Sequence, residues 1–149
     1  MNSKPKTKGR PIQRAVVKVG SNVLTADAGL NINAIQSISS QICRLLNQGM
    51  QIILVSSGAM ASGMKKMDFA KRPEAIPKRQ AISAIGQADL IREWEKAFER
   101  FGYKVAQILL TSDDLTSRKR YLNARNTLNT LLEWQVVPII NENDTIMVE

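Results

Sequence analysis

The sequence contains no histidine and only one cysteine, Cys43. Without histidine the chain can form neither a Ser-His-Asp triad nor an ordinary zinc site, and a single cysteine cannot close an intramolecular disulfide. No apolar run approaches the roughly 20 residues that span a bilayer, and no signal-peptide pattern opens the sequence. These absences predict a protein of the reducing cytoplasm that has no membrane partner.

Acidic residues are scarce, with 13 of them against 21 lysines and arginines, which gives a net charge of +8. Residues 1–14 contain no acid, and they include the bases Lys4, Lys6, Lys8, Arg10 and Arg14. We predict that residues 1–14 form a basic, disordered arm and that residues 15–149 belong to a folded domain. A basic nucleic-acid-binding module is an alternative. We expect no nucleic-acid partner, because aromatic residues make up only 5% of the sequence and are not interleaved with basic ones.

Short apolar runs alternate with helical patterns along the chain. Strands are expected at 16–19, 52–55, 105–110 and 136–140, although Pro138 argues against full pairing of the last one. Helices are expected from a cap at Asn33 to Gly49, and over 59–67, 79–101 and 115–134, with a loop at 71–78. Their apolar faces include Cys43, Ala81, Ala88, Phe101 and Tyr121. This order is typical of an α/β fold with a mainly parallel sheet and helices on both faces.

Polar turns follow three of the predicted strands: GSN at 20–22, SSG at 56–58 and NEND at 141–144. In an open parallel sheet, ligands collect outside the carboxyl ends of the strands, where backbone N–H groups and hydroxyls can hold anions. Lys18, near the end of the first strand, either meets an anionic ligand there or extends into solvent, and the residues alone leave both readings open. The carboxylates of the last turn fit either a metal ion or an ammonium group of a substrate.

Two motifs for other chemistry fail. Residues 58–66, GAMASGMKK, have the paired glycines of a phosphate-binding P-loop, but Met64 stands where that motif requires lysine. A GxSxG nucleophile elbow around Ser56 would need glycine in place of Leu54, and no histidine is present to activate a serine. Turns that hold charged groups suit phosphoryl transfer, since positioning and charge neutralisation supply most of its catalysis.

Five segments together resemble the glutamate 5-kinases of the amino acid kinase family. They are VVKVGSNVLT at 16–25, VSSGAMASGM at 55–64, AISAIGQADLI at 81–91, YLNARNTLNTLL at 121–132 and VPIINENDTI at 137–146. The resemblance implies a three-layer α/β/α sandwich on a mainly parallel sheet. It also implies an ATP- and Mg²⁺-dependent transfer of phosphate to the γ-carboxylate of L-glutamate, the first step of proline biosynthesis, in a homo-oligomeric enzyme.

The resemblance also implies roles for individual residues near the first turn. Lys18 matches the lysine that contacts the nucleotide phosphates and steadies the transferring phosphoryl group. Gly20 and Ser21 match positions where the backbone approaches those phosphates closely. No residue is assigned as a metal ligand.

Residues of the later turns match the acceptor side of the family's site. Ser57 and Gly58 in the SSG turn and Asn141 and Asp144 in the last turn are implied to bind glutamate, with Asp144 holding the substrate through its ammonium group. Asp114 lies in the stretch 111–118, which the family associates with feedback inhibition by proline, and it is a candidate regulatory residue.

The family continues beyond the point matched by residue 149, with further glutamate contacts and the nucleoside-binding half of the sheet. We therefore expect residues 15–149 to be the acceptor-binding part of a kinase domain and to be inactive without the remainder. The alternatives within the family are acetylglutamate, carbamate and nucleotide monophosphate kinases, which differ in the acceptor.

Overall fold

The computed structural model describes residues 13–27 and 29–142, which build a four-stranded parallel sheet in the order β1-β4-β6-β5. The strands of this sheet are β1 (Arg14–Val19), β4 (Gln51–Ser56), β5 (Val105–Leu110) and β6 (Val137–Glu142). A separate antiparallel hairpin consists of β2 (Thr25–Ala26) and β3 (Gly29–Leu30). Arg14 begins β1, and the rest of the predicted arm up to residue 12 lies outside the described residues.

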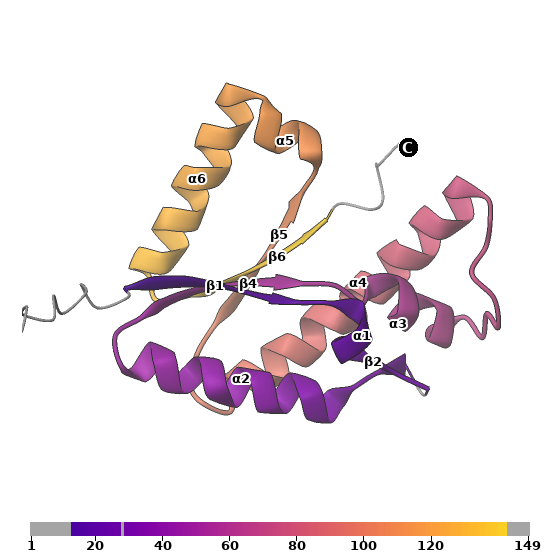
Figure 1. Cartoon of the computed structure of the whole chain (residues 1–149), viewed down its shortest axis with the longest axis horizontal. Coiled ribbons are helices and arrows are strands. Elements are labelled where there is room, and N and C mark those ends of the chain that lie inside the picture. Colours follow the sequence, from indigo (N-terminus) through magenta and orange to yellow (C-terminus); the bar gives the residue numbers. More distant parts are fainter. Residues whose placement is uncertain (1–12, 28, 143–149) are drawn as a thin grey trace, which may run out of the picture.

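Helices cover both faces of the parallel sheet (Figure 1). One face carries α2 (Ile32–Asn47), α3 (Ala59–Lys66) and α4 (Ile76–Glu99), and the other carries α5 (Ser112–Thr116) and α6 (Arg118–Glu133). A single-turn helix, α1 (Ser21–Leu24), follows β1. The predicted three-layer α/β/α architecture is confirmed. None of the helices in the described ranges is long and apolar enough to cross a membrane.

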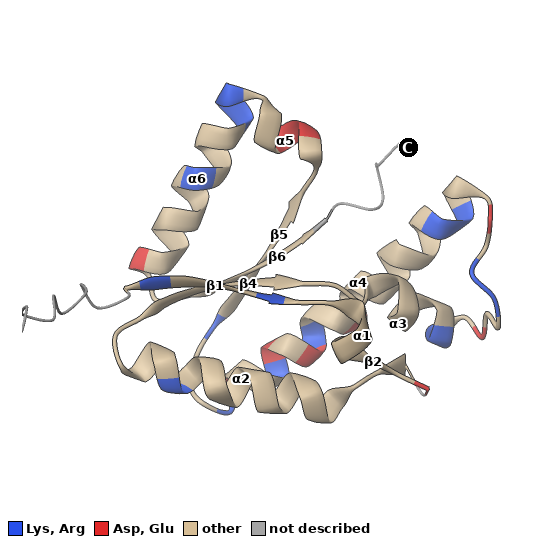
Figure 2. Ribbon diagram, in the orientation of Figure 1, with Lys and Arg blue, Asp and Glu red and all other residues tan. Residues whose placement is uncertain are grey.

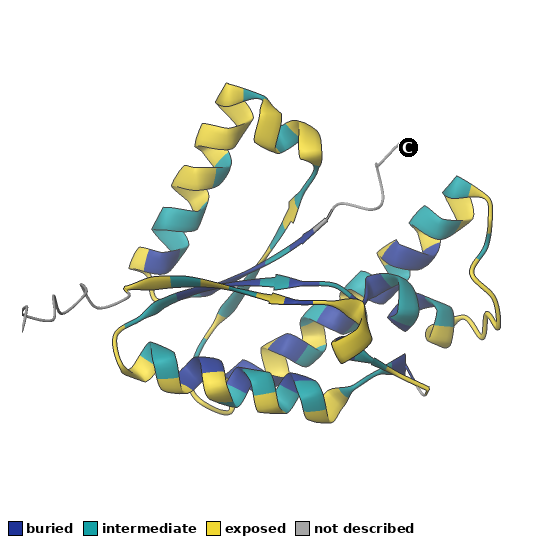
Figure 3. Ribbon diagram, viewed as in Figure 1, coloured by how far each residue is buried: buried dark blue, intermediate teal, exposed yellow. Residues whose placement is uncertain are grey.

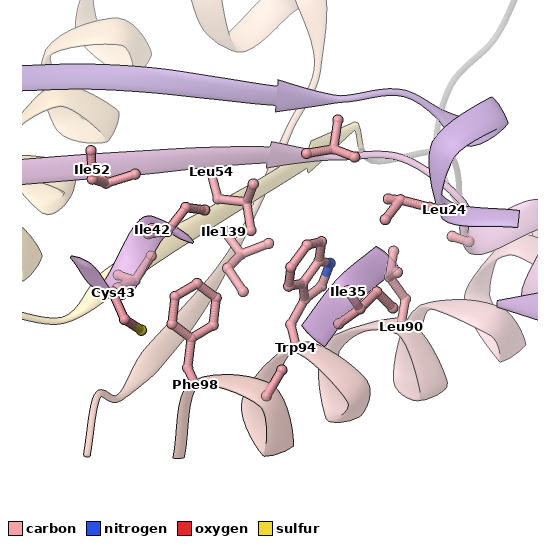
Figure 4. Packing of buried hydrophobic residues seen from close by; sticks show 14 residues of the cluster. Leu24, Ile35, Ile42, Cys43, Ile52, Leu54, Leu90, Trp94, Phe98 and Ile139 are labelled. Carbon is pink, nitrogen blue, oxygen red and sulfur yellow. The ribbon is translucent and has the colours of Figure 1, made fainter. Parts of the chain in front are cut away.

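The core lies between the sheet and the layer formed by α2 and α4 (Figure 4). Trp94 and Phe98 of α4 are fully buried there, with ring centroids 6.1 Å apart, against Leu54 of β4 and Ile139 of β6. Cys43 of α2 is also buried, as predicted, and burial raises the pKa of its thiol to about 11. At neutral pH this cysteine is therefore a protonated, unreactive packing group.

Pro138 lies in an internal strand that is only partly paired, as the sequence indicated. β6 pairs with β5 along its whole length, with Pro138 opposite Ala106, but its pairing with β4 begins only at Ile139. The proline is thus placed where β6 has a neighbour on one side only, so the missing N–H costs no bond to β4.

The helix boundaries and faces differ from the prediction in several places. Asn31, not Asn33, caps α2, because its side chain accepts a hydrogen bond from the N–H of Ala34. The loop predicted over 71–78 is shorter, since α4 begins at Ile76 with Pro77 in its first turn, where a missing N–H is harmless. The buried stripe of the first half of α4 comprises Ile82, Ser83, Gly86 and Leu90. The residues Ala81, Ala88 and Phe101 were predicted to be buried and are exposed.

The last predicted helix is two helices. Ser117 has extended backbone angles and separates α5 from α6. Leu132 is the only buried residue of α6, and Tyr121, which was predicted to be buried, is 46% exposed. In Figure 3 α6 is mostly exposed, whereas α2 and α4 on the opposite face each carry several buried residues.

Two glycines allow α3 and α4 to pack against one another at backbone contact. A Cβ atom added to Gly63 would overlap the carbonyl oxygen of Ile82, and one added to Gly86 would overlap the carbonyl oxygen of Ala59. Gly63 is the second glycine of the rejected P-loop pattern, and its place inside α3 gives it a packing role.

Candidate functional site

The carboxyl ends of β1, β4 and β6 lie side by side at one edge of the sheet. Lys18 is opposite Val55 in the β1–β4 pair, and Val55 is opposite Ile140 in the β4–β6 pair. Since neighbouring strands are about 4.8 Å apart, the carboxyl ends of the three strands lie within roughly 10 Å of one another. Asn141 and Glu142 of the last predicted turn belong to β6, and residues 143 and 144 lie outside the described residues.

Lys18 leaves the sheet on the face covered by α6. Its neighbour Val19 is buried in the opposite core, and alternate side chains of a strand point to opposite faces. The Lys18 side chain is exposed and makes no hydrogen bond or ion pair with any residue that the structure describes. Its ammonium group is accordingly available to an anion in solution.

The two serines of the central turn have different environments. Ser56 is buried and accepts a hydrogen bond from Trp94 Nε1 at 2.9 Å, while its own hydroxyl donates to the carbonyl oxygen of Ser57 at 3.2 Å. Because the indole N–H can only donate, the direction of both bonds is fixed. Ser57 is half-buried, and its hydroxyl has no partner among the described residues, so Ser57 is the serine that can meet a ligand.

The backbone ties the central turn to the end of β1. The N–H of Ser57 donates to the carbonyl oxygen of Val19 at 3.1 Å. Gly58 follows with φ of 106°, a left-handed conformation that favours glycine, and caps the amino end of α3. A residue with a Cβ atom at position 58 would strain the turn that presents Ser57.

Gly20 and Ser21 form the start of α1, which replaces the irregular turn predicted at 20–22. Gly20 is the residue before the helix, and a Cβ placed on it would meet no atom within 4 Å. Open space at this position lets another molecule approach the backbone. Ser21 is exposed, and its carbonyl oxygen accepts from the hydroxyl of Thr25 at 2.8 Å.

Asn141 lies at the end of β6 on the face of the sheet opposite Lys18. It is buried, and its Nδ2 donates to Gln87 Oε1 of α4 at 3.0 Å. Asp144 falls outside the described residues. The site therefore combines groups on both faces of the sheet edge, with Lys18 on one side and Asn141 on the other.

Asp114 has a structural role that the sequence did not indicate. Thr111 and Asp114 form a capping box at the start of α5: the carboxylate accepts from the N–H and hydroxyl of Thr111 at 2.8 and 2.9 Å. Arg120 Nη1 lies 3.6 Å from the same carboxylate. The hydrogen bonds from Thr111, with a smaller contribution from Arg120, lower the pKa of Asp114 below its usual value of 3.8.

This lowered pKa leads to a pH-dependent prediction. A depressed pKa means that the ionised form of Asp114 stabilises the fold, so its contribution is present above about pH 3.8 and disappears as pH falls through the lower, folded-state pKa. We expect Asp114→Ala to lower the melting temperature at pH 7 and to have little effect in strong acid. Thermal unfolding followed by circular dichroism at both pH values measures this, and an equal loss at both would contradict it.

Sequence reasoning missed two polar contacts that support the site. Gln87 and Trp94 lie in the helix predicted over 79–101, and each hydrogen-bonds the end of a strand, at Asn141 and Ser56 respectively. Their spacing of seven residues, which places both on one face of α4, was the available signal.

The basic residues within 13–27 and 29–142 do not gather on one face. Figure 2 shows lysine and arginine spread over β1, α2, α4, α6 and the loop between α3 and α4. A nucleic-acid-binding surface requires a basic stripe or patch. The alternative of a nucleic-acid-binding module is therefore not favoured.

Comparisons with known proteins point to one family. The profile of the Amino acid kinase family matches residues 13–149. The chain is 54% identical over 138 residues to a glutamate 5-kinase of Syntrophotalea carbinolica, a match that covers 93% of this chain and 37% of that enzyme. It is 49% identical over 141 residues to a glutamate 5-kinase of Thermus thermophilus, with 95% of this chain and 38% of the enzyme covered. The chain thus spans little more than a third of the length of these relatives. On this evidence the chain belongs to the amino acid kinase family.

Proposed function

We propose that this chain forms the acceptor-binding part of an enzyme that phosphorylates the γ-carboxylate of L-glutamate with ATP, the first step of proline biosynthesis in the cytoplasm. The observation that carries the proposal is the exposed Lys18 beside the Ser57–Gly58 turn, on neighbouring strands whose ends are joined by the bond from Ser57 to Val19. Relatives named glutamate 5-kinase, about 50% identical to the chain, support the choice of acceptor.

In the proposed reaction, a γ-carboxylate oxygen of glutamate attacks the terminal phosphorus of ATP, and the bond to the bridging oxygen of ADP breaks. The reactants carry negative charge, so they must be neutralised and aligned before they can react. Lys18 supplies a cation near the transferring group. Gly20 and Ser21 present backbone that phosphate oxygens can approach, because the space beside Gly20 is open.

The acceptor is held on the other side of this proposed arrangement. The hydroxyl of Ser57 and the backbone at Gly58 would bind the glutamate, with Asn141 assisting from the end of β6. Asp144 would pair with the α-ammonium group. Asp114, in the helix α5 that follows strand β5, is the proposed link to inhibition by proline.

Magnesium would neutralise phosphate charge when it is bound. The described residues contain no group of three or more His, Cys, Asp or Glu side chains that could hold a metal ion. Mg²⁺ is usually held by substrate phosphates and water with only one or two protein carboxylates, so it would not need such a group. We also expect the complete enzyme to be a homo-oligomer, which sedimentation of the purified gene product would test.

The proposed function is tested directly with the complete gene product. We expect release of ADP with glutamate as acceptor and none with acetylglutamate, bicarbonate with ammonia, or uridine monophosphate. Coupled ADP detection under identical conditions compares the four acceptors. Phosphorylation of another acceptor in preference to glutamate would assign the chain to a different branch of the family.

Ser57→Ala tests the acceptor side of the site. The lost hydroxyl contacts the ground state and the transition state alike, so we expect the KM for glutamate to rise by about tenfold with little change in kcat or in the KM for ATP. Ser37→Ala, at an exposed serine of α2, is the matched control. A change confined to the KM for ATP would show that the two substrates are assigned to the wrong turns.

A further inference from the structure

Helix α4 contacts both proposed halves of the acceptor site. Trp94 holds Ser56, the residue before the Ser57–Gly58 turn, and Gln87 holds Asn141 at the end of β6. β4 and β6 are neighbouring strands, but their register pairs run only through Leu54–Ile139 and Val55–Ile140. Beyond these pairs, the strand ends depend on other groups for their relative position.

Gln87 lies at the point where α4 also contacts α3. Its neighbour Gly86 packs at backbone contact against Ala59, the first residue of α3, directly after the turn. Two successive residues of one helix therefore reach the two sides of the site, Gly86 toward the turn and Gln87 toward Asn141. Because both residues belong to the same rigid helix, α4 holds the turn and Asn141 at a fixed distance from each other.

The hydrogen bond between the two amides also sets the rotation of Asn141. Asn141 is 8% exposed, and its Nδ2 donates to Gln87 Oε1 at 3.0 Å. An amide has a donor end and an acceptor end, so anchoring the nitrogen toward α4 turns the carbonyl oxygen away from it. Removing the Gln87 acceptor would take away the bond that turns the donor end of the Asn141 side chain toward α4.

We infer that Gln87 is a positioning residue of the acceptor site, which holds Asn141 in the orientation and at the distance from the Ser57–Gly58 turn that glutamate binding requires. The inference rests on the proposed function. Gln87 acts through Asn141 and not by touching the substrate, so its loss should weaken the binding of the acceptor and leave the nucleotide side unaffected.

Gln87→Met in the complete gene product tests this, because methionine keeps the length of the side chain and loses the acceptor oxygen. We expect the KM for glutamate to rise about tenfold, equivalent to about 1.4 kcal/mol, with kcat and the KM for ATP nearly unchanged. Gln41→Met is the matched control, since Gln41 is an exposed glutamine of α2 that bonds only within its own helix. Gln87→Asn, which is too short to reach Asn141, provides a second variant should the methionine disturb folding.

A double-mutant cycle separates positioning from direct contact. If Gln87 acts through Asn141, adding Gln87→Met to Asn141→Ala should raise the KM for glutamate less than twofold further. A full tenfold rise in that background would overturn the inference, as would an unchanged KM in both Gln87 variants of an active enzyme. If the unmodified gene product leaves glutamate unphosphorylated, the proposed function fails first, and the role of Gln87 in it fails as a consequence.

Discussion

Replacing Lys18 with alanine should reduce kcat of the complete gene product by about 10²–10³-fold, the usual loss when one preorganised charge-stabilising group is removed. In the proposed reaction, negative charge grows on the transferring phosphoryl group and its leaving oxygen, and the Lys18 ammonium group, which has no competing partner among the described residues, would neutralise it. The KM for glutamate should change far less. Steady-state kinetics with both substrates varied measures the two effects separately.

Lys104→Ala is the matched control for this experiment. Lys104 is an exposed lysine next to the amino end of β5, at the sheet edge opposite the proposed site. Its loss should leave kcat unchanged. Lys18→Arg should restore part of the activity, because the charge returns with a different geometry. Equal rates for Lys18→Ala and Lys104→Ala would remove Lys18 from the catalytic machinery.

Replacing Gly86 with alanine should have the largest effect on stability. In an unobstructed helix interior this change would stabilise the protein by about 0.5–1 kcal/mol, because alanine has the higher helix propensity. Here the added Cβ would overlap the backbone of α3 at Ala59, so α3 and α4 must separate. We expect the free energy of unfolding to fall by about 3 kcal/mol, near the upper end for overpacked sites. Denaturant unfolding measures it.

Gly20→Ala is the matched control, because it also replaces a glycine with alanine but creates no overlap with another helix. The Cβ at position 20 would meet no atom within 4 Å, and its φ of −79° suits any residue. Its effect on stability should stay within about 0.5 kcal/mol. A Gly86→Ala protein as stable as Gly20→Ala would mean that the helices tolerate a wider separation. Because α3 begins directly after Gly58, Gly86→Ala should also weaken glutamate binding.

Patterns in short stretches of sequence predicted the strands and the place where their ends meet. The strand at 105–110 is present with the predicted bounds, and the carboxyl ends of β1, β4 and β6 lie side by side as expected for parallel strands. Both depend on residue preferences and on the rule that parallel strands share the direction of their ends.

Contacts between residues far apart in the sequence could not be predicted from such patterns. Periodicity cannot show that Gln87 faces Asn141, which is 54 positions away, or that Tyr121 remains exposed because little packs on α6. The close contact of α3 and α4 had a signal that was not used. Gly63 and Gly86 each lie inside a predicted helix, where glycine is unfavourable unless a neighbour approaches closely.

The strand order also governs how the protein is assembled during synthesis. β6 is translated after β4 and β5 but lies between them, so β4 is paired only with β1, and β5 has no partner strand in this sheet, until the ribosome has added the residues up to position 142. Until then the backbone N–H and C=O groups that will pair with β6 are open to incorrect pairing. Closing the sheet is consequently a late event, and slowing translation shortly before β6 should increase aggregation of the nascent chain.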